Sequence, residues 1–136
     1  MKKVLIFGTF DRLHKGHIHF IKKAKEITDD PDNTNLFVVV AKDHNVGEFK
    51  GKKPIDNELK RLMNVYLLGL AKKVILGEKE KMWFFRQINQ IKPNIICLGY
   101  DQDDQGLEEY IKERKLKIKI VKIDAFEPEK YKSSKM

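Results

Sequence analysis

Two histidines near the N-terminus are the residues of this sequence best suited to do chemistry. His14 and His17 flank Gly16, and a glycine lets a ligand approach the backbone closely. Imidazoles at this spacing can face one oxyanion, and each can donate a hydrogen bond to a phosphoryl oxygen whose charge grows in the transition state. The pair predicts chemistry on a phosphate, with two unrelated surface histidines as the alternative interpretation.

A zinc site is a second use for these imidazoles. The other candidate ligands of this kind are His19, His44 and a single cysteine, Cys97. No four-ligand set with zinc spacing is present, so phosphate is favoured over zinc. Cys97 stands in an apolar run, which predicts a small buried hydrophobe rather than a nucleophile.

The histidines follow directly on the first strand that the sequence predicts. Residues 4–7 form a short apolar run ending at Gly8, which is typical of a strand buried on both faces. After His17 the apolar residues recur at helical spacing, which predicts a helix. A helix N-terminus offers unpaired N–H groups and the positive end of a dipole, so an anion lying across this turn would be held by backbone as well as side chains.

The same patterns continue along the chain as alternating strands and helices. Further strands are predicted at 36–41, 72–77, 94–98 and 117–123, and further helices at 55–70, 79–91 and 105–115, followed by an extended tail at 124–136. In the helix at 55–70 the apolar face consists of Leu59, Leu62, Met63 and Tyr66.

This order predicts an α/β fold with one domain spanning residues 1–136. Right-handed crossovers make the strands parallel, in a Rossmann-like three-layer sandwich of five strands in the order 3-2-1-4-5 with helices on both faces. The first and fourth strands then lie side by side while their outgoing loops diverge. We expect a ligand crevice at that point, between the two histidines and the pair Tyr100 and Asp101.

The segment after the second strand adds positive charge beside this crevice. Residues 42–54 are punctuated by glycines and carry several lysines, which predicts a mobile loop that could close over a triphosphate. An ordinary exposed basic loop is the alternative.

Composition narrows the choice of partners. The net charge is +8, carried mostly by lysines scattered along the chain, and this favours anionic ligands. Nucleic-acid modules, Walker loops and Gly-x-Gly-x-x-Gly motifs are absent from the sequence. No apolar run is long enough to cross a bilayer or to form a signal peptide, and a lone cysteine suits a reducing compartment. We expect a cytoplasmic protein without membrane or specific nucleic-acid partners.

An aromatic pair, Trp83 and Phe84, stands beside the apolar stripe of the helix predicted at 79–91. Such a pair can pack on a second subunit, although core or loop packing is the more common explanation. A homodimer is therefore among the predicted assemblies.

The stretch Gly8-Thr9-Phe10-Asp11 followed by His14-Lys15-Gly16-His17 resembles the signature of the cytidylyltransferase-like nucleotidyltransferases. The resemblance implies that the two histidines contact a nucleoside triphosphate, that loop lysines matching Lys50 and Lys52 contact its phosphates, and that no covalent enzyme intermediate forms. It also implies Mg²⁺ or another divalent cation, which Asp11 would help to place unless it orients the turn. The implied nucleotide-binding residues are Gly8, Thr9, Phe10, Asp11, Gly16, Gly99, Tyr100, Asp101, Ser133 and Ser134.

Later motifs are similar to one branch of this family. Leu98-Gly99-Tyr100-Asp101-Gln102, together with 41–43 and 50–54, resembles the archaeal-type FAD synthases more than the glycerol-3-phosphate cytidylyltransferases. The resemblance implies in-line attack of a phosphorylated acceptor on the α-phosphorus of ATP or CTP, with FMN as the favoured acceptor and glycerol 3-phosphate as the alternative. A non-catalytic nucleotide-binding regulator and a cationic nucleic-acid-binding protein are the alternatives from other classes.

The resemblance is weakest at the C-terminal end. Many relatives carry Arg-Thr-x-Gly-Ile-Ser-Thr/Ser-Thr and a following helix, and only residues 131–135 are similar to that segment. The far wall of the nucleotide pocket would then come from Lys132, Ser133 and Ser134 alone or from a second subunit, or else the activity is altered.

Overall fold

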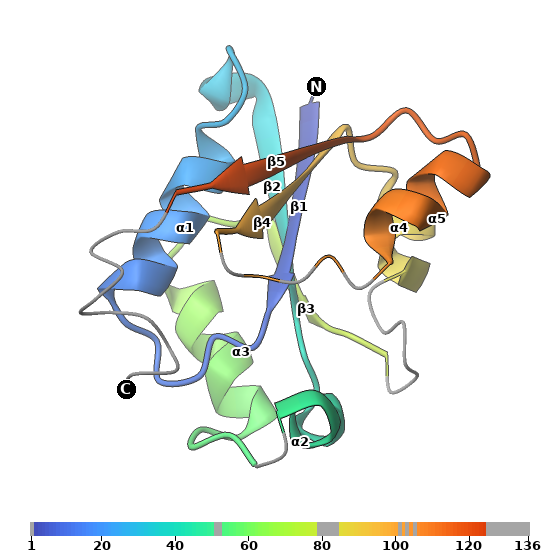
Figure 1. Cartoon of the computed structure of the whole chain (residues 1–136). Coiled ribbons are helices and arrows are strands. Elements are labelled where there is room, and N and C mark those ends of the chain that lie inside the picture. Colours follow the sequence, from blue (N-terminus) through green and yellow to red (C-terminus); the bar gives the residue numbers. More distant parts are fainter. Residues whose placement is uncertain are drawn as a thin grey trace.

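A five-stranded parallel sheet forms the centre of the protein (Figure 1). The computed structural model describes residues 2–50, 53–78, 85–100, 102, 104 and 106–124, with the side chains of 47–50 excepted. The strands lie in the order β3-β2-β1-β4-β5, which confirms the predicted topology. Their bounds are β1 Lys2–Gly8, β2 Thr34–Val40, β3 Lys73–Leu76, β4 Ile95–Gly99 and β5 Lys119–Ile123.

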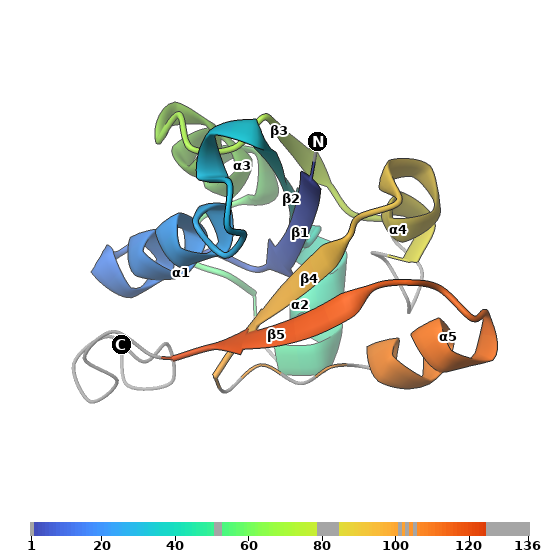
Figure 2. The ribbon, with the colours of Figure 1, turned by 90° about the horizontal axis from the view of Figure 1, so that it is seen from above.

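Helices cover both faces of the sheet, so the predicted three-layer arrangement is also confirmed. Figure 2 shows α1 (Lys15–Lys25) and α3 (Glu58–Leu67) on one side, and α4 (Phe85–Ile91) and α5 (Leu107–Glu113) on the other. The side chains of β1 alternate between the two layers. Val4 and Ile6 pack in one buried cluster with Ile21 of α1, whereas Leu5 and Phe7 pack in the other with Ile88 of α4.

The first and fourth strands separate toward their carboxyl ends. β1 pairs with β2 over seven residues, from Lys2 to Gly8, but with β4 only at Val4 and Leu5. The chain then leaves β1 toward α1 on one face and leaves β4 toward α5 on the other. This divergence opens the ladder at the place where the strand order reverses, which is where ligands bind in folds of this kind.

The segment predicted as a mobile loop at 42–54 begins as a helix, and that prediction was wrong for its first part. α2 spans Asp43–Lys50, after which residues 51 and 52 lie outside the described residues. Val46 is 1% exposed and packs in the core, and the amide of Asn45 donates to the carbonyl of Glu78 at 2.7 Å. A single glycine costs only about 1 kcal/mol inside a helix, so these tertiary contacts outweigh Gly47.

Most of the apolar face predicted for α3 points to solvent, and of its four residues only Leu62 is half-buried. Leu59, Met63 and Tyr66 are 64%, 46% and 61% exposed, while the buried residues of the helix are Arg61 and Val65. Arg61 is directed inward by its hydrogen bonds, and this turns the apolar stripe outward. The exposed stripe of α3 comprises Ile55, Leu59, Met63, Tyr66 and Leu67.

Several predictions fall on residues outside the described ranges. These are the aromatic pair Trp83 and Phe84, which the predicted helix at 79–91 contains, and most of the predicted tail at 124–136. Among the residues that the structure describes, no helix combines the length and the apolar composition needed to span a bilayer.

The reversed face of α3 can be tested by unfolding. Val65→Ala removes two buried methyl groups and should lower the free energy of unfolding by about 2 kcal/mol. Leu59→Gln changes an exposed side chain and should stay within about 0.5 kcal/mol of the parent. Urea denaturation of both variants measures the difference, and a larger loss for Leu59→Gln would mean that the helix is rotated.

Candidate active site

The turn between β1 and α1 has a strained backbone held by a buried ring. Phe10 and Arg12 have φ of 56° and 50°, in the left-handed region, which costs a non-glycine residue about 1–3 kcal/mol. The ring of Phe10 is 4% exposed and lies against Gly8, where an added Cβ would meet it at 3.2 Å. Gly8 therefore makes room for Phe10, and Phe10 anchors the turn in the core.

The two histidines form the N-terminal cap of α1. His14 is the N-cap residue, and its Nδ1 accepts from the backbone N–H of Gly16 at 3.0 Å. The Nδ1 of His17 accepts from the backbone N–H of His14 at 3.3 Å, so the pair completes a capping box. Because both Nδ1 atoms are acceptors, each neutral ring carries its proton on Nε2.

The rings also orient one another. The imidazoles of His14 and His17 are stacked, with centroids 3.8 Å apart and planes 25° apart. Phe10 packs edge-on against His17 at 5.7 Å. Burial, and after it the positive charge of Arg12, holds the pKa of His14 below its usual value near 6.5. At neutral pH His14 is thus an uncharged Nε2–H donor.

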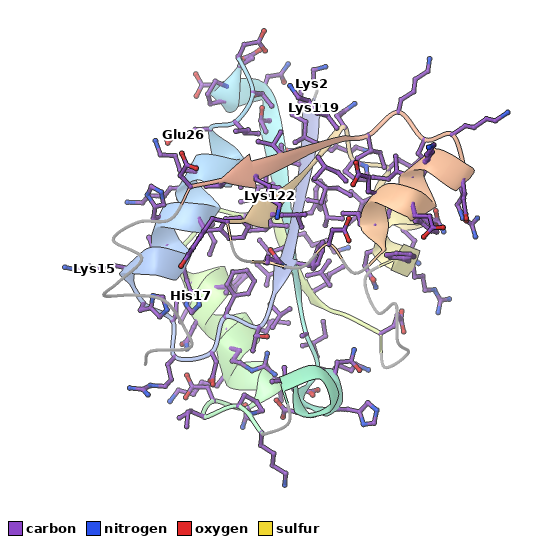
Figure 3. The ribbon with its side chains drawn as sticks, in the orientation of Figure 1. Lys2, Lys15, His17, Glu26, Lys119 and Lys122 are labelled. Carbon is purple, nitrogen blue, oxygen red and sulfur yellow. The ribbon has the colours of Figure 1, made fainter. Side chains whose placement is uncertain are left out.

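Figure 3 shows where this turn lies relative to the lysine side chains. Lys15 and His17 are both in the first turn of α1, but Lys15 points away from the protein. Lys2 and Lys119 begin β1 and β5 and lie at the opposite end of the sheet. Their positive charges belong to the surface rather than to the histidine turn.

Asp11 links this turn to the segment that leads into α3. Its Oδ2 accepts from the backbone N–H of Ile55 and its Oδ1 from that of Asp56, both at 2.8 Å. The carboxylate thus orients the turn, as one interpretation of the sequence expected.

Arg61 is a buried residue of the site that sequence reasoning missed. Its side chain is fully buried at the carboxyl ends of β1 and β2. Nη1 donates to the carbonyls of Thr9 at 2.9 Å and Ala41 at 2.8 Å, and Nη2 bonds Oδ1 of Asp43 at 2.6 Å. Nε donates to the carbonyl of Asp56 at 3.0 Å. The sequence gives little signal for this role, because an arginine on the face of a helix opposite Leu59 is normally exposed.

Gln102 joins the first and fourth strands where their ladder has opened. Its Nε2 donates to the carbonyl of Phe7 at 2.8 Å, and its Oε1 accepts from the backbone N–H of Gly99 at 3.0 Å. The sequence placed Gln102 in the fourth-strand motif but gave it no role. The contact brings the end of β4 to the end of β1, as the predicted crevice requires.

The turn between β1 and α1, with its two ends, holds the predicted residues Gly8, Thr9, Phe10, Asp11, His14, Gly16 and His17. The other predicted residues lie elsewhere in the chain. Gly99 ends β4, and Tyr100 follows it with 38% of its surface exposed. Lys50 ends α2, with its side chain outside the described residues. Lys52, Asp101, Ser133 and Ser134 also lie outside the described residues.

A hollow of about 430 Å³ lies beside the turn. Asp11 of the turn accepts a hydrogen bond from the backbone of Ile55, which is one of the residues that line this hollow. Its other walls are the start of α2 and the segment before α3, and the lining residues are Asp43, His44, Lys53, Pro54, Ile55 and Asn57.

The described residues do not form a metal site made of protein ligands alone. Within these ranges, no group of three or more histidine, cysteine, aspartate or glutamate side chains is arranged to hold one. Cys97 lies in the buried cluster under α1, and burial raises its pKa to about 12, so it is a protonated core residue as predicted.

The fold and the turn define a class of α/β protein in which a pair of stacked imidazoles caps the helix that follows the first parallel strand. Residues 5–136 match the family model described as cytidylyltransferase-like. The chain belongs to this family, and the predicted enzyme class, a nucleotidyltransferase, is confirmed.

Curated relatives and solved structures agree with this family. The chain is 42% identical over 125 residues to a FAD synthase of Methanosarcina barkeri, covering 90% of this chain and 84% of the relative. It is 40% identical over 136 residues to a FAD synthase of Archaeoglobus profundus, covering 98% and 82%. The predicted resemblance to FAD synthases is thus confirmed.

The fold agrees with a solved structure as well. A lipopolysaccharide core biosynthesis protein from Thermoplasma volcanium superposes with a TM-score of 0.79 at 37% identity, covering 93% of this chain and 99% of that one. A pantoate-beta-alanine ligase from Francisella tularensis shares the fold at a TM-score of 0.62 and 16% identity, covering 90% and 59%.

Acidification should destabilise the protein through His14. Because its pKa is lower in the folded state than the usual value near 6.5, the unfolded chain takes up a proton first. The contribution of His14 to stability is therefore complete above about pH 6.5 and is lost as the pH falls through the folded-state pKa.

The control is His14→Asn, whose amide oxygen can still cap α1 but does not titrate. Melting temperatures of both proteins between about pH 8 and pH 5 should show a steeper acidic loss for the parent. Parallel losses would contradict the assignment.

Proposed function

We propose that this chain is an FMN adenylyltransferase, which transfers AMP from ATP to FMN and so makes FAD and pyrophosphate. The observation that carries the proposal is the pair of stacked imidazoles whose Nδ1 atoms accept backbone N–H groups at the start of α1, which places the ring protons on Nε2. The chain shares about 40% identity with FAD synthases over most of its length, which supports FMN as the acceptor.

The reaction is a direct displacement at phosphorus. An oxygen of the FMN phosphate attacks the α-phosphorus of ATP. The bond from that phosphorus to the oxygen between the α- and β-phosphates breaks, and pyrophosphate leaves with the electron pair. A phosphate monoester has a second pKa near 6, so the acceptor is already an anion at neutral pH. No general base is required, and catalysis is positioning and charge stabilisation.

His14 and His17 stabilise the charge that develops on the transferred phosphate. Each Nδ1 accepts a backbone N–H at the N-terminus of α1, and a hydrogen bond of this kind polarises the ring and strengthens its Nε2–H donor. In this way the partial positive charge at the N-terminus of α1 acts on the substrate through the imidazoles. The sequence had suggested that backbone groups would meet the anion, but the N–H of Gly16 is already used by His14.

The remaining assignments follow the family pattern. Lys50 and Lys52 would neutralise the β- and γ-phosphates, and Tyr100 and Asp101 would border the nucleotide where β4 ends. Gly8, Thr9, Phe10, Asp11 and Gly16 shape the floor of that pocket, and Ser133 and Ser134 would belong to its far wall.

A divalent cation would enter with the triphosphate and share its charge. Asp11 is the carboxylate of the histidine turn, and each of its oxygens, which has more than one lone pair, accepts a hydrogen bond, from Ile55 or from Asp56. Asp11 as a contact of the cation is part of this proposal.

The flavin ring needs an apolar wall, and three surfaces near the turn are candidates: Phe10, Tyr100 and the hollow. Phe10 is in the core and cannot supply an exposed face. Tyr100 is 38% exposed, and Ile55 and Pro54 border the hollow beside the turn. Tyr100 and this hollow are therefore the two surfaces that we assign to the ring.

A homodimer in the cytoplasm remains part of the proposal, and light scattering of the purified protein measures the assembly.

The role of the imidazoles predicts the kinetics of His17→Ala. The variant should lose about 10²–10³ in kcat, because one donor to the developing charge is gone, with a smaller change in KM for FMN. It loses one capping hydrogen bond, which costs only about 1 kcal/mol, so it should stay folded. His19→Ala, two residues further along α1, is the control and should retain parental kcat. Parental kcat in His17→Ala would refute the site.

The acceptor is tested by pyrophosphate release with each triphosphate and acceptor in turn. ATP with FMN should give pyrophosphate and FAD in equal amounts, identified by mass spectrometry. Release that depends on CTP and glycerol 3-phosphate would move the chain to the other branch of the family. Binding of ATP without turnover on any acceptor would instead indicate a nucleotide-binding regulator.

A further inference from the structure

Arg61 lies where two parts of the active site diverge. The last backbone bond that joins the first two strands runs from the N–H of Ala41 to the carbonyl of Gly8, at 2.9 Å. Beyond it the chain after β1 continues into the histidine turn, while the chain after β2 turns into α2. Arg61 takes the place of the missing strand pairing, because one of its nitrogens bonds both Thr9 and Ala41.

The N-terminal end of α3 is tied to both diverging segments. Three hydrogen bonds reach the histidine turn: one from Arg61 to Thr9 and two from the backbone at 55 and 56 to Asp11. Three more reach the start of α2: two from Arg61, to Ala41 and Asp43, and one from the N–H of Asp43 to Glu58 at 2.9 Å. The separation of the two segments is thus set by one rigid element.

We propose that Arg61 is a positioning residue for nucleotidyl transfer, a role that rests on the proposed function. By holding the histidine turn against the start of α2, it keeps the imidazoles at a fixed separation from the hollow that His44 and Lys53 line, so that both meet one triphosphate. The residue does not touch the reacting atoms. It acts through Thr9 and Asp43, at the two ends of its guanidinium.

Stability alone does not account for a guanidinium at this position. Burying an ion pair is often no better for stability than packing apolar side chains of similar volume. A planar guanidinium, in contrast, donates from three nitrogens in fixed directions, and here all three are used. A lysine has a single nitrogen and cannot span these partners, so Arg61→Lys keeps the charge and removes the geometry.

The test compares Arg61→Lys with Val65→Ala, a buried substitution one turn along the same helix that removes none of these hydrogen bonds. Both are assayed at a temperature where circular dichroism shows them folded. Arg61→Lys should weaken binding of Mg-ATP, measured by calorimetry without acceptor, and should lower kcat by about 10²-fold, the scale expected for a misplacement of about 1 Å. Val65→Ala should retain the parental dissociation constant and kcat despite its lower melting temperature. Equal behaviour of the two variants would overturn the proposal.

A second pair of variants decides the matter if Arg61→Lys does not fold. The side chain of Asp43 is 39% exposed, so its replacement opens no large cavity, and both Asp43 variants are assayed at a temperature where circular dichroism shows them folded. Asp43→Asn keeps an oxygen acceptor for Arg61 and should lose less kcat than Asp43→Ala. Parental kcat in Asp43→Ala would overturn the proposal. Binding of Mg-ATP is measured without acceptor, so the comparison of Arg61→Lys with Val65→Ala holds whatever the acceptor is. If FMN is not the substrate, the proposed function is refuted and the role of Arg61 is not.

Discussion

The hydrogen bonds of one buried guanidinium hold together the edge of the sheet where β1 and β2 end. Parallel strands end at a common edge, and the chain must leave each of them in a different direction. Carbonyl groups at that edge lose their strand partners, and a buried carbonyl without a partner is costly. Arg61 supplies donors to Thr9 and Ala41 at once and has its own charge matched by Asp43. Its burial turns the apolar stripe of α3 outward.

The histidine turn depends on this arrangement. Two of its residues have left-handed backbone conformations, which persist only where the surroundings fix them. The ring of Phe10 on one side and the carboxylate of Asp11 on the other provide that fixation. His14 and His17 then cap α1 with their Nδ1 atoms, and each neutral ring carries its proton on Nε2. One pair of side chains thus starts the helix and, in the reaction that we propose, donates to the phosphate.

The parts of the structure that follow from local sequence could be predicted. The five strands are short apolar runs, and the rule for right-handed crossovers leaves few possible orders for them. The position of His14 and His17 at the start of a helix was predictable because their spacing and the turn residues before them are all local. These features fixed the fold, the edge of the sheet and the family.

The parts that depend on distant partners could not be predicted. Asp11 bonds a segment 44 positions away, and Gln102 bonds Phe7 across 95 positions. The buried face of α3 was missed because hydrophobicity ranks Leu59 above Arg61, whereas the unpaired carbonyls that draw Arg61 inward are a property of the folded sheet. α2 was missed because Gly47 signals a break, and only the packing of Val46 and Asn45 outweighs it.

A crystal structure with magnesium and α,β-methylene-ATP, which cannot be cleaved at the α-phosphorus, tests the central claim most directly. The account predicts phosphate oxygens within hydrogen-bonding distance of Nε2 of both His14 and His17, with the bonds from Arg61 to Thr9, Ala41 and Asp43 retained. A triphosphate bound elsewhere, or bound here with either Nδ1 turned toward the phosphates, would contradict it.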